Sequence, residues 1–133
     1  MFRDMGEKDE AKLTDLEART VPWTEQRINA GDYMGLLAVA ADGAVAAGIG
    51  MWLVEWQPST VSSGRRAMFL NVYTEPEHRR RGLARMLMEA ALAWCRENKI
   101  QVAFLHASDD GRPLYAALGF KPTSEMRLIV RQD

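Results

Sequence analysis

The sequence contains few of the residues that build disulfide frameworks and metal centres. It has one cysteine, Cys95, and two histidines, His78 and His106, among 133 residues. A single cysteine excludes an intrachain disulfide and fits a reducing compartment, so we expect a cytoplasmic location. The two histidines lie far apart in the chain and no Cys/His cluster surrounds them, so no metal site is predicted.

Long hydrophobic runs and a strong excess of one charge are also missing. No stretch reaches the roughly 18 apolar residues that a membrane-spanning helix needs, and the polar N-terminus is unlike a signal peptide. The formal net charge is −1, which argues against a surface built for nucleic acid. We therefore expect neither a membrane nor a nucleic acid as a partner.

The composition is that of an ordinary globular protein. Apolar residues make up 47% of the chain and charged residues 26%, which is close to the average for folded domains. The length fits one domain over residues 1–133, and a domain of this size buries roughly two thirds of its unfolded surface. A hydrophobic core is therefore expected.

The hydrophobic pattern predicts an α/β sandwich with a mixed sheet flanked by helices. Two short helices, separated by a break at Pro22-Trp23, are expected before Gly31. A hairpin turn is expected at residues 41–43. Helices are predicted at residues 80–98, where one apolar stripe includes Ala90, and at 113–118. Strands are predicted at residues 33–40, 44–56, 67–74, 100–106 and 126–130. The fourth of them is expected to be buried and parallel to its neighbour. In the third, Phe69, Asn71 and Tyr73 are expected to face away from the side that carries Val72.

A basic loop joins the strand that ends at Thr74 to the helix that begins near Gly82. The first backbone N–H groups of a helix lack internal partners, and the helix dipole adds partial positive charge there. Gly82 lets a phosphate approach the backbone, and the arginine side chains can add charge-assisted contacts. The loop Arg79-Arg80-Arg81-Gly82-Leu83-Ala84 therefore predicts an anion site that suits a diphosphate.

Other interpretations of this loop are less well supported. The glycines of a dinucleotide-binding fingerprint are missing, and so is the Gly-Lys-Ser/Thr of a P-loop. A contact with nucleic acid would rest on one arginine cluster without interleaved aromatics. A merely solvated helix start fits poorly, because arginines oppose the helix dipole at that end.

Two motifs closely resemble the GNAT family of N-acetyltransferases. The stretch from Leu70 to Arg85 is similar to the family's strand, pyrophosphate loop and helix start, with Thr74-Glu75-Pro76 in the place of its Val-x-Pro. The stretch from Leu114 to Phe120 resembles its Leu-Tyr-x-x-Leu-Gly-Phe signature. The resemblance is specific over residues 67–128 and implies a GNAT-like fold, although the family's usual first strand is missing.

The resemblance also implies roles for individual residues in binding acetyl-CoA. Backbone groups of Val72 and Thr74 would meet the pantetheine arm, and Tyr115 would give a proton to the departing thiolate. Asp109 departs from the family, which often has asparagine there. The pyrophosphate would be held by backbone amides and nearby side chains of Arg79, Arg80, Arg81, Gly82, Leu83, Ala84 and Arg85.

The acceptor side is less defined by the sequence. A neutral amine must lose a proton when it attacks a thioester, and Glu55 or Glu75 could remove it directly or through water. Trp52 and Trp56 share a face of one predicted strand, where they pack in the core or wall the acceptor pocket. His106 ends a buried strand and is expected to be a structural group.

Three functions therefore stand beside one another. The leading hypothesis is transfer of an acetyl group from acetyl-CoA to a small-molecule or peptide amine. The alternatives are a CoA-binding or regulatory module without turnover and, more distantly, a nucleic-acid accessory domain. Because strand 33–40 becomes an exposed edge if the first strand is missing, a homodimer is also predicted, with the N-terminal helices or this edge at the contact. A start that lies inside a longer protein is the competing explanation.

Overall fold

The computed structural model of the chain describes residues 10–62, 64–79 and 81–130. From residue 33 to residue 118, the strands and the two longer helices follow one another in the predicted order. The elements are α1 (Glu10–Ala30), β1 (Tyr33–Val39), β2 (Val45–Val54), β3 (Arg66–Thr74), the 3-10 helix η2 (Pro76–His78), α2 (Leu83–Glu97), β4 (Ala103–Leu105) and α3 (Arg112–Ala117).

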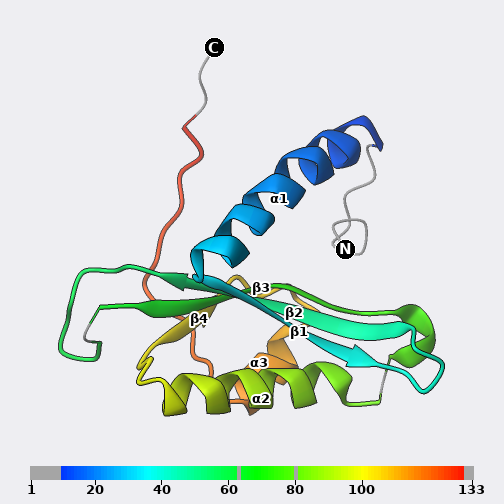
Figure 1. Ribbon diagram of the computed structural model, residues 1–133. Helices are drawn as coiled ribbons and strands as arrows, with labels where there is room; N and C mark the ends of the chain where they lie inside the picture. The colour runs from blue at the N-terminus through cyan, green and yellow to red at the C-terminus, as the bar shows by residue number, and fades with distance from the viewer. Residues whose placement is uncertain (1–9, 63, 80, 131–133) are drawn as a thin grey trace.

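One mixed sheet forms the centre of the molecule. Its strand order is β1-β2-β3-β4; the first two pairings are antiparallel, and β4 runs parallel to β3. The hairpin between β1 and β2 closes where the Ala40 N–H donates to the Ala44 carbonyl at 2.8 Å. Helix α1 lies on one face of the sheet, and α2 and α3 lie on the other (Figure 1). The predicted α/β fold with a mixed sheet is confirmed.

The hydrophobic core lies between the sheet and α2. Met51 of β2 and Met88 of α2 are fully buried and are its largest completely enclosed side chains. The Cys95 thiol is buried beside Met51, with the two sulfur atoms 3.6 Å apart, so this cysteine is a packed structural group. Ala90, predicted in the buried stripe, is exposed. Because each residue rotates the helix by 100°, Met88, two positions before Ala90, faces the core instead.

The N-terminal part of the described chain is one helix, so the prediction of two short helices was wrong. Helix α1 continues through Pro22, although proline in a helix interior removes a hydrogen bond and costs about 3 kcal/mol. The next residue supplies a compensating contact, because the Trp23 ring packs edge-on against Trp52 at 5.1 Å and against Tyr33 at 6.1 Å. Packing of the helix on the sheet therefore outweighs the local proline signal.

Strand β3 contains a bulge that changes which side chains face the core. Gly48 pairs with Tyr73 and Gly50 with Leu70, so two residues of β3 lie opposite Ile49 alone. Asn71 within the bulge has φ +59°, a value rare for residues other than glycine. Val72 consequently packs against the same core as Phe69, and the predicted strict alternation along residues 67–74 was wrong.

The last predicted strand does not form. Residues 126–130 have no secondary structure and leave the domain as an extended segment (Figure 1). The side chains of Met126 and Leu128 are 94% and 83% exposed. No strand precedes Tyr33 in the described part of the chain. Among the described helices, none combines the length and the hydrophobicity that crossing a membrane requires.

Candidate active site

The start of α2 has an open, uncapped N-terminus. Gly82 is its N-cap residue in the left-handed conformation, with φ +73°, and a Cβ atom added at this position would meet open space. Among the described residues, no side chain caps this helix end and no acidic residue lies in its first turn. The first amide N–H groups of α2 therefore have no protein partner that neutralises the dipole.

The basic side chains around this loop contact other protein groups. Arg79 Nε donates to the Thr74 carbonyl at 3.0 Å, which folds the loop back onto the end of β3. Arg81 Nη1 lies 3.5 Å from His78 Nδ1, and Arg85 pairs with Glu89 at 2.9 Å. Arg80 lies outside the described residues. Arg79, Arg81 and Arg85 are thus engaged by groups of the protein itself.

A gap in strand pairing lies next to this loop. Strands β3 and β4 pair only at Ala67–Phe69 with Ala103–Leu105, whereas β3 continues to Thr74. Beyond these three pairs, the edge of β3 that carries Val72 has no partner strand among the described residues. The bulge at Asn71 lies immediately after the last pair, so it marks the point where the two strands separate.

Tyr115 lies on α3, the short helix on the same side of the sheet as α2 (Figure 1). Its ring packs against Phe120 with 6.0 Å between centroids and contacts the hydrophobic core. Burial raises the pKa of the Tyr115 phenol above its ordinary value of 10.0, because desolvation disfavours the phenolate. The hydroxyl is therefore protonated at neutral pH and can act as a proton donor.

The loop that leads into α3 is held by local contacts. Ser108 Oγ accepts from the Gly111 N–H at 3.2 Å, and a side chain at position 111 would collide with the Tyr115 ring. Asp109, which departs from the family pattern, forms an exposed ion pair with Arg112 at 3.5 Å. Gly111 therefore leaves the space that the Tyr115 ring occupies beside this loop.

The two carboxylates considered as bases lie at opposite ends of the sheet. Glu75 follows β3, and its N–H donates to the Ala46 carbonyl at 2.8 Å. Glu55 follows β2, whose last residue, Val54, pairs with Arg66 at the start of β3. From Arg66 to Thr74, β3 advances by eight residues, which corresponds to about 26 Å between these two ends. The structure thus places Glu75 beside the anion loop and does not bring Glu55 to it.

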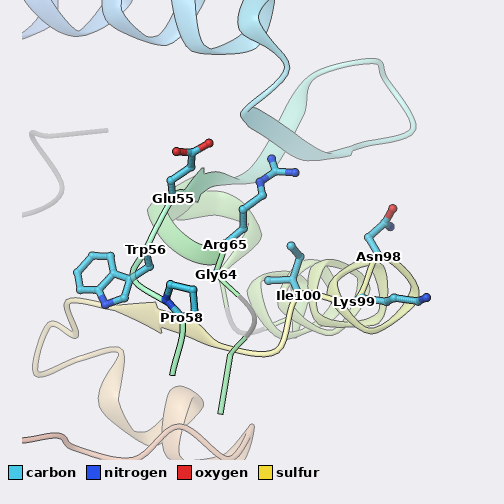
Figure 2. A pocket seen from close by; sticks show the side chains of 8 residues that line it. All are labelled: Glu55, Trp56, Pro58, Gly64, Arg65, Asn98, Lys99 and Ile100. Carbon is cyan, nitrogen blue, oxygen red and sulfur yellow. The ribbon is translucent and has the colours of Figure 1, made fainter. Parts of the chain in front are cut away.

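Glu55 instead lines an open pocket of about 500 Å³. Figure 2 shows this pocket, with Glu55 and Arg65 on one side and Lys99 after the end of α2 on the other. Trp56 borders it and is 47% exposed, while Trp52 packs on α1. Neither tryptophan belongs to the core below the sheet. The pocket lies at the far end of α2 from Gly82, so it is separate from the anion site.

Two positions that hold the bulge in place were missed by the sequence analysis. Asn71 Nδ2 donates to the Tyr33 hydroxyl at 2.9 Å, and Gly50 leaves the space that this hydroxyl occupies. Tyr33 is only 7% exposed. The sequence signal was weak, because a tyrosine that starts a strand and a glycine within another give no sign that they meet. His106, expected as a buried group, is exposed, because β4 ends before it.

These features agree with comparisons with known proteins. The family model described as "Acetyltransferase (GNAT) family" matches residues 3–120. A GCN5-related N-acetyltransferase from Ralstonia eutropha is 37% identical, with a TM-score of 0.88 over 98% of this chain and 85% of that chain. The chain therefore belongs to the GNAT acetyltransferase family. Among curated proteins, no sequence match to the chain was found.

Two more distant solved structures share the fold and contain ligands. A predicted acetyltransferase from Clostridium acetobutylicum, crystallised with acetyl-CoA, is 22% identical, with a TM-score of 0.86 over 97% of this chain and 82% of that chain. The aminoglycoside-type enzyme AAC(6')-Iy, in complex with the bisubstrate analogue CoA-S-monomethyl-acetylneamine, is 20% identical. Its TM-score is 0.68 over 96% of this chain and 83% of that chain.

Proposed function

We propose that this protein transfers an acetyl group from acetyl-CoA to a primary amine by direct attack in a ternary complex. The observation that carries the proposal is the uncapped start of α2 beside the unpaired edge of β3. A diphosphate fits the first feature, and an extended amide-containing chain fits the second. Acetyl-CoA contains a diphosphate and an extended amide-containing chain, and it carries them in that order along the molecule. The acceptor is a small-molecule or peptide amine, and the site of action is the cytoplasm.

In this proposal, the chain binds and orients acetyl-CoA through its backbone. Amides of residues 79–84 hold the pyrophosphate, supported by the positive potential of the arginines. Backbone groups of Val72 and Thr74 hydrogen-bond to the pantetheine arm. The bulge at Asn71 turns these groups toward the separation between β3 and β4, and the hydrogen bond from Asn71 to Tyr33 keeps the bulge in place.

The chemical step needs two proton transfers. The amine nitrogen attacks the thioester carbonyl carbon, a C–N bond forms, and the C–S bond breaks. Tyr115, whose phenol stays protonated at neutral pH, gives its proton to the departing sulfur as the C–S bond breaks. The amine proton passes to water or to a base at the thioester end of the β3 edge. Glu75 lies beside the pyrophosphate loop, at the opposite end of the extended cofactor, so the geometry does not favour it as this base. Glu55 is not assigned a role in this step.

A thiol-release screen tests the proposal. The purified chain is mixed with acetyl-CoA and a panel of polyamines, amino acids, aminoglycosides and peptide N-termini, and each amine is analysed for a gained acetyl group by mass spectrometry. We expect amine-dependent thiol release with at least one class. Acetyl-CoA binding without release from any class would favour the CoA-binding module without turnover.

A further inference from the structure

The face of the sheet opposite the core carries a row of large apolar side chains. Trp52, Met68 and Phe104 pair directly across β2, β3 and β4, so their side chains share one face. Trp52 packs on Trp23 of α1, which identifies this face as the one that carries α1. None of the three belongs to the core on the other face, and all three remain partly exposed. Such a row suits an apolar ligand.

Two further side chains border this row at the start of β3. The Trp56 ring packs against Phe104 with 5.8 Å between centroids. The Arg66 guanidinium lies over the Trp56 ring, 5.0 Å from its centroid. Arg66 and Met68 are two residues apart on β3, so they point to the same face. We call these five residues, Trp52, Trp56, Arg66, Met68 and Phe104, the acceptor face.

Arg66 is a half-buried cation without an anionic partner in the described chain. Its Nε is buried and has no hydrogen-bond partner, and no ion pair joins the guanidinium to a described carboxylate. Charges that lose contact with water are ordinarily paired. The stack on Trp56 holds the guanidinium in place, and its two Nη groups form a fork that matches a carboxylate. The geometry therefore favours an anionic group of a ligand beside Arg66.

The acceptor face borders the place where the acetyl group would be transferred. Met68 lies one residue before Phe69, the last residue of β3 that pairs with β4. In the proposed function the thioester lies in the separation that follows. Tyr115 is on the opposite side of the sheet, on α3 (Figure 1). An amine that attacks from the side free of this acid therefore crosses the acceptor face.

We propose that the acceptor is a primary amine whose apolar or aromatic body ends in a carboxylate. This inference rests on the proposed acetyl transfer and names its substrate class. The body packs on Met68 and Phe104, and the carboxylate pairs with Arg66, which thereby determines specificity. From Arg66 to Phe69 the strand advances about 10 Å, which favours several atoms between amine and carboxylate over an α-amino acid. An amine with a second cation at that end is rejected by Arg66.

Two acceptors that differ only at the far end test the inference. They are 4-(aminomethyl)benzoate and 4-(aminomethyl)benzamide, which share the ring and the amine but differ in charge. Thiol release with acetyl-CoA should give a kcat/KM at least about tenfold higher for the carboxylate, the scale of one charge-assisted pair. Arg66→Gln should abolish this preference, while the kcat/KM of the benzamide stays within about twofold and acetyl-CoA affinity is unchanged by calorimetry.

Arg65→Gln is the matched control. Arg65 is the adjacent arginine, is exposed and lines the pocket beside Glu55, so its substitution makes the same change in net charge. It should keep the preference for the carboxylate. Loss of the preference in Arg65→Gln to the same extent as in Arg66→Gln would overturn the inference, because it would show a general effect of positive potential.

Other outcomes separate this inference from the proposed function. Equal kcat/KM for the two acceptors in the unaltered protein, or a preference that survives Arg66→Gln, would overturn the inference alone. So would turnover of polyamines or aminoglycosides with neither of the two benzyl amines accepted. No thiol release with any amine would refute the proposed function itself. The comparison of the two acceptors on the unaltered protein keeps the test valid even if Arg66→Gln folds poorly.

Discussion

The contact between Gly50 and Tyr33 gives a prediction whose size follows from the geometry. A Cβ atom on Gly50 would overlap the Tyr33 hydroxyl, would lie 2.7 Å from its Cζ and would lie 3.1 Å from the Leu70 carbonyl oxygen. Tyr33 is buried, so its ring cannot swing into solvent. Gly50→Ala should therefore cost about 1–3 kcal/mol, the usual range for overpacking a core.

Tyr33→Phe tests the same contact from the other side. Removing the hydroxyl leaves Asn71 Nδ2 without its acceptor, at a cost of about 1 kcal/mol because Asn71 is only half-buried. It also relieves the worst overlap with an alanine at position 50, although Cζ remains too close. The double variant should therefore be less destabilised than the sum of the two single variants, by about 1 kcal/mol.

Thermal and urea unfolding of the four proteins measure this coupling. At about 2.1 cal/mol/K per residue, each kcal/mol lowers the melting temperature of a chain of this length by about 3–4 °C. Additive effects of the two substitutions, within about 0.5 kcal/mol, would refute the proposed contact between the Tyr33 hydroxyl and position 50.

The remaining predictions concern the chemistry, the pH dependence and α1. Tyr115→Phe should lower turnover by about 10²-fold or more while leaving the acetyl-CoA dissociation constant nearly unchanged, as measured by steady-state kinetics and calorimetry; equal turnover at every pH would remove Tyr115 as the acid. Burial raises the pKa values of Tyr33 and Tyr115 above 10.0 in the folded protein, so the unfolded chain loses these protons first and stability should fall as pH rises above about 10. Melting temperatures measured from pH 8 to 11 should show this loss, and Tyr33→Phe should reduce it; an equal loss in the variant would contradict the assignment. Pro22→Ala should stabilise the protein by about 1–3 kcal/mol, because it restores an N–H donor inside α1, and an unchanged urea midpoint would show that the helix is already broken there.

The parts of the fold that depend on local signals were predictable. Hydrophobic periodicity located α2, and the Gly31 and Gly43 turn signals located the limits of β1. The junction between β3 and α2 was also predictable, because a glycine at the start of a helix follows the end of a strand within a short basic stretch. The Leu114-to-Phe120 motif located α3 and Tyr115.

The parts that depend on tertiary contacts were not predictable from one sequence. The bulge at Asn71 shifts by one residue which side chains of β3 face the core. This shift is visible only in the register between β3 and β2. Pro22 indicates a break, but the packing of Trp23 on Trp52 holds the helix together. Met126–Val130 has the composition of a strand but lacks a partner within the described chain. Glu55 and Glu75 both follow strands, and only the antiparallel pairing places them at opposite ends.

Acetyl-CoA binding at the start of α2 is the central claim, and calorimetric titration of a glycine variant tests it most directly. Gly82→Trp places a large side chain where the phosphates would lie, at a position that is open in the structure. Gly31→Trp is the matched control, because Gly31 also has positive φ and open surroundings but follows α1 at the other end of the sheet. We expect Gly82→Trp to weaken acetyl-CoA binding at least about tenfold, and Gly31→Trp to bind like the unaltered protein. Equal affinity in Gly82→Trp and the unaltered protein would contradict the claim.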